Sequence, residues 1–197
     1  MDKTTSRNWL LALLGVLMLA TRLPPAAAVT HLHDTSWAIF FIAGFYFTTQ
    51  WRWVFPVLMI EAVLIDYVAI GFLGVSNYCV TPAYWFLVSA YAALWAGGSW
   101  LERHHSMDAR GLGLFAINLI GALSLSYFIS NASFYWIGDR VAERSFDGWV
   151  KNFGDWYWPM LKMPLLYCSA AALVHLTITQ IADLQAKGYI GVMSFRR

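Results

Sequence analysis

The chain has 197 residues, of which 59% are hydrophobic and 17% aromatic, while only 12% are charged and the mean hydropathy is +0.55. A soluble domain carries about 25% charged residues, so this composition excludes an ordinary soluble protein and indicates an integral membrane protein in a lipid bilayer. The net charge is only +2 and no block of Lys and Arg is present, so nothing indicates a nucleic-acid partner.

Six apolar segments approach or exceed the roughly 18 to 20 residues that a helix needs to cross a hydrocarbon core about 30 Å thick. The predicted spans are residues 8–29, 33–50, 53–72, 83–101, 111–130 and 156–182. These lengths leave little room for a second domain. The sequence therefore predicts an all-α integral membrane protein in which residues 1–197 form one transmembrane domain of six helices.

The first span has an alternative interpretation. Lys3 and Arg7 precede its apolar run and three alanines, 26–28, follow it, which is also the layout of a secretory signal peptide. We favour a membrane helix because the apolar character resumes after the two prolines and five further spans follow.

Lys and Arg in short flanking segments are enriched on the cytoplasmic side of a membrane. If the N-terminus is cytoplasmic, the inner flanks carry Lys3, Arg7, Arg52, Arg103, Arg110, Lys187, Arg196 and Arg197, and the outer flanks carry Arg22, Arg140, Arg144 and Lys151. This bias predicts that both termini are cytoplasmic. The connections that contain residues 31–33, 71–82 and 131–155 then face the outside.

The last of these connections has a pattern of its own. Apolar residues recur at helical spacing, at Phe146, Trp149, Val150, Phe153 and Trp156, while the charged residues fall on a different face. This pattern predicts an amphipathic helix at the outer interface. It is either an aromatic anchor for the bundle or an apolar lid over a ligand that the outer loops bind.

A carboxylate and a thiol lie close together in the sequence at the outer surface. Asp66 is near the end of the third span, and Cys79 is in the uncharged loop that follows, beside Tyr78. Glu61 is on the same helix, but five residues advance a helix by about 140°, so it projects from another face and we assign it to helix contacts. Cys168 lies at bilayer depth in the last span, so we expect Cys79 to be a free thiol.

The role of Cys79 has several interpretations. It is either an inert small residue, or a nucleophile or soft metal ligand that acts as a thiolate. No Cys-x-x-Cys partner accompanies it, so a structural zinc site is not indicated. His31 and His33, followed by Asp34, are in the first outer loop and form either a solvated loop or a weak metal-ion site.

Asp66 and the run Asn77-Tyr78-Cys79-Val80-Thr81-Pro82-Ala83-Tyr84-Trp85 resemble the BtuM family, in a chain of matching length and hydropathy. These are vitamin B12 (cobalamin) transporters related to the substrate-binding S-components of energy-coupling factor (ECF) transporters. The resemblance implies a multi-pass S-component-like bundle in the bacterial cytoplasmic (inner) membrane, with a cobalamin site that opens to the extracytoplasmic side. It assigns Cys79 to the cobalt and places Asp66 and Tyr84 around it. Tyr78, next to Cys79 in the loop, is a further candidate contact to the ligand.

One feature departs from S-components that depend on an ECF module. Their first helix contacts the coupling subunit through small residues four apart, whereas here Ala12 and Ala20 flank Val16. The resemblance therefore leaves two options, an ECF module as partner or a solitary protein, and the departure suits the solitary one.

Thiolate chemistry is compatible with this resemblance. A thiolate is a soft, strongly donating ligand, and at an axial position of cobalt it would hold cobalamin without its own base. Donation from sulfur would weaken the bond to the opposite ligand, so decyanation of cyanocobalamin at Cys79 would be a side activity. Two other functions remain open: a membrane thiol enzyme with Cys79 as nucleophile and an outer histidine as base, and a cobalt or nickel ion carrier that uses His31, His33 and Asp66.

Overall fold

The structure of the chain is a computed structural model that describes residues 3–23, 33–106 and 108–187, and all regular structure in these ranges is helical. The α-helices are α1 (Lys3–Arg22), α3 (Ser36–Tyr46), α4 (Trp51–Phe72), α5 (Phe86–His104), α6 (Ala109–Ile137) and α7 (Phe146–Ala186). Short 3₁₀ helices lie at Thr48–Gln50 and Pro82–Trp85. The prediction of an all-α protein is confirmed for the described residues.

Among the described residues, three helical segments are long and apolar enough to cross a membrane: Thr48–Phe72, Ala109–Ile137 and Phe146–Ala186. Helix α3 is also apolar, but its 11 residues measure only about 16 Å, which is shorter than the hydrocarbon core and shorter than the predicted span 33–50. The described part of the chain is therefore helical, with three helices capable of spanning a membrane, and the arrangement with six spans stays a prediction.

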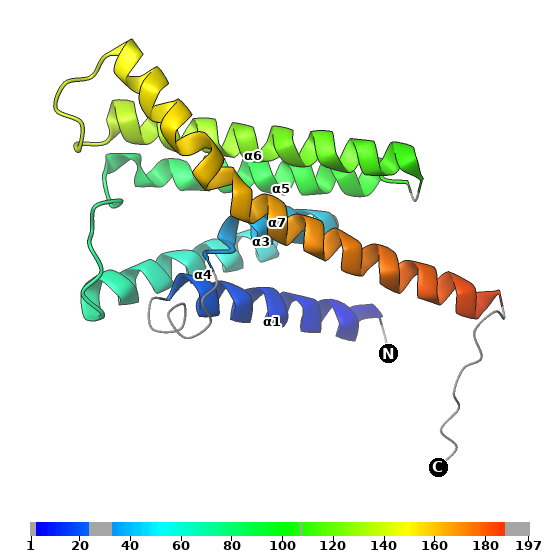
Figure 1. Ribbon diagram of the computed structural model, residues 1–197. Coiled ribbons are helices and arrows are strands. Elements are labelled where there is room, and N and C mark those ends of the chain that lie inside the picture. Colours follow the sequence, from blue (N-terminus) through cyan, green and yellow to red (C-terminus); the bar gives the residue numbers. More distant parts are fainter. Residues whose placement is uncertain (1–2, 24–32, 107, 188–197) are drawn as a thin grey trace.

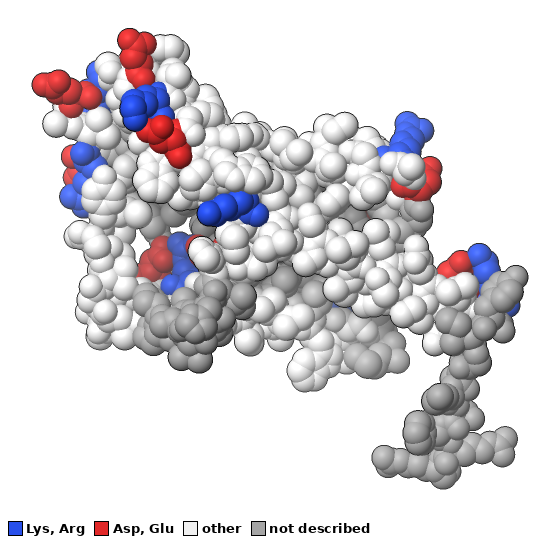
Figure 2. All heavy atoms as spheres, in the orientation of Figure 1, with Lys and Arg blue, Asp and Glu red and all other residues white. Residues whose placement is uncertain are grey.

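The outer surface of the helices is apolar along much of their length. Ile117 on α6 is 74% exposed and Leu173 on α7 is 65% exposed. Figure 2 shows, on one face of the molecule, that most charged side chains gather at the two ends, with largely uncharged side chains between them. A bilayer would cover such a belt, whereas a soluble protein rarely leaves so much contiguous apolar surface in water.

Helix α3 lies at the centre and packs against α1, α4, α5 and α7. Its nearly fully buried residues are Ser36, Ala38, Ile39, Phe40, Phe41, Ala43 and Gly44. Glycines allow α3 and α5 to approach closely: a Cβ atom added at Gly44 would meet the backbone of Trp95, and one added at Gly98 would meet the backbone carbonyl of Phe41. Close backbone approach through small residues is the usual way in which membrane helices pack.

Helix α7 combines the predicted interfacial helix and the predicted last span. Its 41 residues correspond to about 60 Å, roughly twice the thickness of the hydrocarbon core, so part of it must project beyond the core. Figure 1 shows a change of direction near the middle of α7, where Pro159 and Pro164 lie. The prediction of a separate helix at 146–156 is therefore wrong in its boundaries.

The aromatic residues at the start of α7 pack on α6. The rings of Trp149 and Phe128 lie 5.9 Å apart, and those of Phe153 and Tyr127 lie 4.7 Å apart. By contrast, Phe146 is 67% exposed. This packing agrees with an aromatic anchor between two helices, the first of the two interpretations of this segment.

The two ends of the bundle differ in what they contain. Helix α1 begins and α7 ends at one end, next to the α5–α6 turn, whereas the α4–α5 connection and the α6–α7 loop lie at the opposite end (Figure 1). We call the opposite end, with residues 73–85 and 138–145, the loop end.

Candidate functional site

A bidentate ion pair joins α1 to α4 near the loop end. Arg22 is the last residue of α1, where a cation complements the helix dipole. Its Nε and Nη2 atoms donate to Oδ1 and Oδ2 of Asp66, each at 2.7 Å. The two side chains are only 14% and 22% exposed, so the pair is largely shielded from water. Asp66 is thus held by a cation from another helix.

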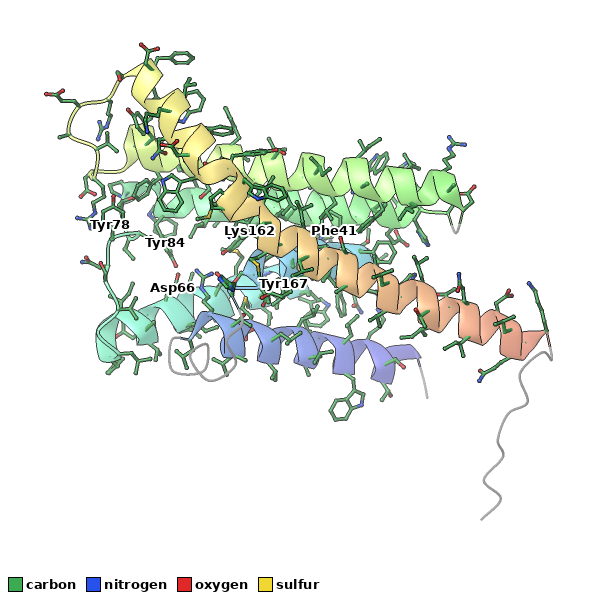
Figure 3. All side chains as sticks on the ribbon, viewed as in Figure 1. Phe41, Asp66, Tyr78, Tyr84, Lys162 and Tyr167 are labelled. Atoms are coloured by element: carbon green, nitrogen blue, oxygen red, sulfur yellow. The ribbon has the colours of Figure 1, made fainter. Side chains whose placement is uncertain are left out.

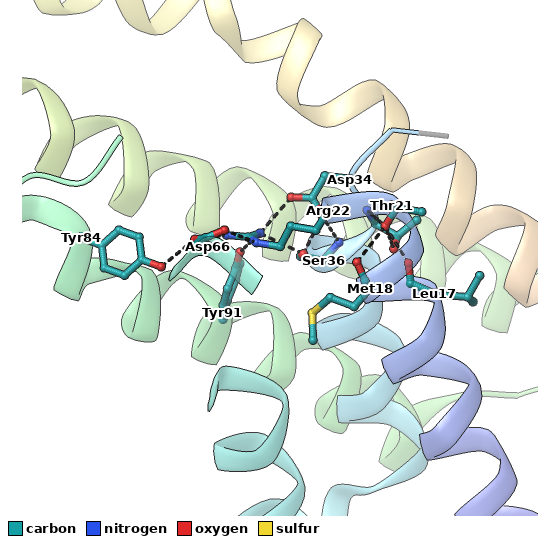
Figure 4. Close-up of polar contacts among 10 residues, drawn as sticks. Leu17, Met18, Thr21, Arg22, Asp34, Ser36, Asp66, Tyr84 and Tyr91 are labelled. Atoms are coloured by element: carbon teal, nitrogen blue, oxygen red, sulfur yellow. Dashed lines mark hydrogen bonds and ion pairs between the residues drawn. The ribbon is translucent and has the colours of Figure 1, made fainter. Parts of the chain in front are cut away.

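The same guanidinium reaches the start of α3 and the side of α5. Its Nη1 atom donates to Asp34 Oδ2 at 2.9 Å, to Ser36 Oγ at 3.0 Å and to Tyr91 Oη at 3.2 Å (Figure 4). Asp34 Oδ1 accepts in turn from the backbone N–H and the hydroxyl of Ser36, at 2.8 and 2.6 Å. One arginine therefore connects α1, α3, α4 and α5.

Tyr84 reaches Asp66 from the 3₁₀ helix before α5. Thr81 caps this short helix by accepting a hydrogen bond from the backbone N–H of Ala83, and Pro82 occupies its first turn. The Tyr84 hydroxyl donates to Asp66 Oδ2 at 2.7 Å. The structure thus brings together two of the residues that the sequence singled out, Asp66 and Tyr84.

These side chains lie in a hollow of the surface. We call Arg22, Asp34, Ser36, Asp66, Tyr84 and Tyr91 the Arg22 cluster. Figure 2 shows acidic and basic atoms deep in a hollow, and Figure 3, in the same orientation, places Asp66 and Tyr84 there, pointing toward each other. The Asp34 and Asp66 side chains are 46% and 22% exposed, so both carboxylates can be reached from outside.

The loop with Tyr78 and Cys79 is attached to the α6–α7 loop. Gly74, whose φ of 69° suits a residue without a Cβ atom, leads the chain away from α4. Arg140 donates to the backbone carbonyl oxygens of Tyr78 at 3.2 Å and Asn77 at 3.4 Å, and its guanidinium lies 5.6 Å from the centre of the Tyr78 ring. This clamp fixes the backbone immediately before Cys79.

Cys79 is exposed and free, whereas Cys168 is free but only 2% exposed. The expectation of a free thiol in the loop is confirmed. Among the residues that the structure describes, none makes a hydrogen bond to the Cys79 sulfur. The thiol is therefore open to a ligand that approaches the loop end from outside.

The outer histidines are only partly described. His33 is exposed, and its backbone exchanges two hydrogen bonds of 3.1 Å with the Tyr167 hydroxyl, while His31 lies outside the described residues. The described part of the chain contains no group of three or more His, Cys, Asp and Glu that could hold a metal ion. The Arg22 guanidinium is bonded to both oxygens of Asp66, and its positive charge would repel a metal ion at this carboxylate. The ion-carrier interpretation gains no support from this geometry.

A separate cavity of about 300 Å³ lies at the other end of the bundle, between α3, α6 and α7. Its lining is largely apolar and includes Phe45, Cys168 and two histidines, His105 and His175. His175 Nδ1 lies 2.7 Å from the Tyr46 hydroxyl, so this histidine has a hydrogen-bond partner inside the bundle. Because this volume is at the lower limit for drug-sized ligands, a corrinoid is too large for the cavity.

The sequence analysis missed Arg22 and Arg140 as site residues, since it counted them only as outer charges, and it did not name Ser36 and Tyr91, which bond to Arg22. Arg22 carried a usable signal, because a charge at the end of an apolar helix normally pairs with a neighbour and Asp66 is an acid at the matching depth. Arg140 gave no such signal, because it binds backbone carbonyls, which exist at every position.

Comparisons with known proteins add no relative. No protein-family model matches the chain, and no curated protein matches it either.

Proposed function

We propose that this chain is a cobalamin uptake protein of the bacterial cytoplasmic membrane, of the kind that the BtuM family represents. The observation that carries the proposal is the hydrogen bond from Tyr84 to Asp66, at the same end of the bundle as the exposed thiol of Cys79. These are the three residues that the resemblance assigns to the corrinoid. The accessible hollow at Asp66 and Tyr84 supports a ligand site at this end of the bundle.

In this proposal Cys79 is the lower axial ligand of cobalt. A thiolate suits a borderline metal ion, and the exposed sulfur has no hydrogen-bond partner among the described residues that it must first give up. Coordination displaces the ligand's own dimethylbenzimidazole, so cobalamin is bound base-off. Arg140 holds the loop backbone next to Cys79, which reduces the loss of chain entropy when the bond forms. Tyr78 lies on the same loop, and in this proposal it is a further contact to the corrinoid.

Coordination by the Cys79 sulfur would also promote decyanation, the loss of cyanide from the cobalt of cyanocobalamin. Strong donation from the thiolate weakens the bond between cobalt and the ligand on the opposite side. When that ligand is cyanide, it leaves as an anion with the bonding electron pair, and the oxidation state of cobalt does not change. Cys79 is then the residue on which this side activity depends.

The proposed topology has six membrane spans with both termini in the cytoplasm. The loop end then faces the outside, where a scavenged vitamin arrives. The start of α1 and the end of α7 share the opposite end of the bundle, which supports an arrangement with both termini on one side.

We propose further that the protein acts without an ECF module. Helix α1 exposes Trp9, Leu13 and Val16, which are 67%, 54% and 62% exposed. Bulky apolar side chains of this kind suit contact with lipid, whereas close helix docking uses small residues.

The test is cobalamin binding by the purified protein. Equilibrium dialysis with cyanocobalamin is expected to give stoichiometric binding to the wild type and to Cys168→Ala, and much weaker binding to Cys79→Ala. Failure of the wild type to bind would refute the proposal. Dialysis against cobalt(II) or nickel(II) without corrinoid tests the ion carrier, and a covalent substrate adduct on Cys79 would indicate the thiol enzyme.

A further inference from the structure

Most hydrogen-bond donors of the Arg22 cluster point toward acceptors within the cluster, chiefly its own carboxylates. The Tyr84 hydroxyl donates to Asp66, and the Ser36 hydroxyl donates to Asp34. Arg22 directs N–H groups from all three of its nitrogen atoms to partners within the cluster. Among the described members of the cluster, the exposed groups therefore have few hydrogen atoms left for a ligand.

The same groups retain lone pairs. A carboxylate offers about four acceptor positions, and each of the two carboxylates already accepts three hydrogen bonds: Asp66 from Arg22 twice and from Tyr84, and Asp34 from Arg22 and from Ser36 twice. One position remains on Asp66 Oδ1 and one on Asp34 Oδ2. The Tyr84 oxygen, whose only proton is engaged, is also left as an acceptor.

The net charge of the cluster also disfavours an anionic ligand. Two carboxylates face one guanidinium, so the cluster has a formal charge of −1 in a site where Asp66 is only 22% exposed. An anionic group placed against the two carboxylates would lose hydration without gaining a hydrogen bond from the cluster itself, and the negative charge would repel it. Figure 3 labels Lys162 of α7 near the same region, and among the described residues it forms no ion pair with Asp34 or Asp66.

We infer that the Arg22 cluster is a specificity-determining subsite that accepts hydrogen bonds from neutral donor groups, primary amides above all, and rejects carboxylates. Arg22 is the positioning residue, because its guanidinium donates to both Asp66 oxygens. The inference rests on the proposed function, since cobalamin carries primary amides around the corrin ring. It adds a rule of selection that the resemblance does not contain: corrinoids with acid side chains are excluded at Asp66 and Asp34.

Two corrinoids without a nucleotide loop test this selection: dicyanocobinamide, which has amide side chains, and dicyanocobyrinic acid, which has carboxylic acids at these positions. We expect the wild type to bind the amide form at least tenfold more tightly at pH 7.5. In Asp66→Asn, which can donate as well as accept, this ratio is expected to fall at least fivefold. The matched control is Asp155→Asn, which removes the same charge from an acid that pairs only with Lys151 among the described residues, and should keep the wild-type ratio.

The outcomes separate the two proposals. Equal binding of both corrinoids by the wild type overturns the subsite and leaves the proposed function intact, as does an unchanged ratio in Asp66→Asn. Binding of neither corrinoid and of no cobalamin overturns the proposed function and the subsite with it. If Asp66→Asn does not fold, Asp34→Asn takes its place, because the Asp34 side chain is 46% exposed and tolerates the change more easily, and the same fall in the ratio is required.

Discussion

Arg22 and Asp66 are 44 residues apart in the sequence, yet two nitrogen atoms of the guanidinium donate to the two oxygens of the carboxylate at 2.7 Å each. This pair connects the end of the first helix to the helix that precedes the Cys79 loop. It makes the geometry of the site depend on the packing of the whole bundle.

Loss of the Arg22 cation is expected to destabilise the protein. In Arg22→Met, Asp34 and Asp66 lose their shared counterion, and removal of one partner from a largely buried pair costs about 3 kcal/mol. Arg22→Lys should recover part of this loss, because lysine keeps the charge but not the bidentate geometry. Thermal unfolding in detergent measures the effect. The control Lys151→Met removes an exposed surface pair and should leave the melting temperature unchanged; equal effects of the two substitutions would contradict the role of Arg22.

Removal of the Tyr84 hydroxyl should weaken ligand binding without changing the ligand of cobalt. Tyr84→Phe deletes one hydrogen bond to a carboxylate, and such bonds contribute about 1.5 to 3 kcal/mol. We expect cobalamin affinity to fall about tenfold, measured by titration, with the absorption spectrum of the bound form unchanged. Tyr157→Phe is the control, because it loses a hydroxyl bond to Ser124, and neither residue belongs to the cluster. An altered spectrum in Tyr84→Phe would assign this residue a different role.

Arg140 is expected to control how long the ligand stays bound. Arg140→Gln removes the clamp on the carbonyls of Asn77 and Tyr78, so the Cys79 loop becomes more mobile and cobalamin should dissociate several times faster. Stopped-flow displacement measures this rate. Arg144→Gln is the control in the same connection, since Arg144 binds Gly138 and not the Cys79 loop. Unchanged dissociation in Arg140→Gln would show that the clamp does not position Cys79.

The proposed orientation places Cys79 outside the cell. A membrane-impermeant maleimide should therefore label the wild type in spheroplasts, and Cys79→Ser, which retains only the buried Cys168, should remain unlabelled. Excess cobalamin should protect Cys79 from the reagent. Labelling that requires prior lysis would reverse the topology.

Close packing of α3 on α5 should make the bundle sensitive to one methyl group. Gly98→Ala places a Cβ atom against the backbone carbonyl of Phe41, and backbone cannot move aside as a side chain can, so we expect a loss of about 2 kcal/mol or more. Gly121→Ala on α6 meets no atom within 4 Å and should be neutral. The two melting temperatures in the same detergent provide the comparison, and equal values would contradict the packing described.

The sequence predicted those features that depend on local order. The all-α class follows from composition and apolar runs. The proximity of Asp66 to Tyr84 was implied by the family resemblance, and in the structure it depends on a helix end, a short loop and a capped turn. Arg22 was missed because its pairing depends on how α1 packs on α4. The length of α7 was also missed, because Pro159 and Pro164 normally indicate a break, whereas here the helix bends and continues.

The most direct test of the central claim is the visible absorption spectrum of cobalamin bound to the purified protein. If Cys79 is the axial ligand, the wild type and Cys168→Ala will show a bound spectrum that differs from free cobalamin at the same pH. In Cys79→Ala this difference will be absent. A Cys79→Ala protein that binds cobalamin with the wild-type spectrum would contradict the account.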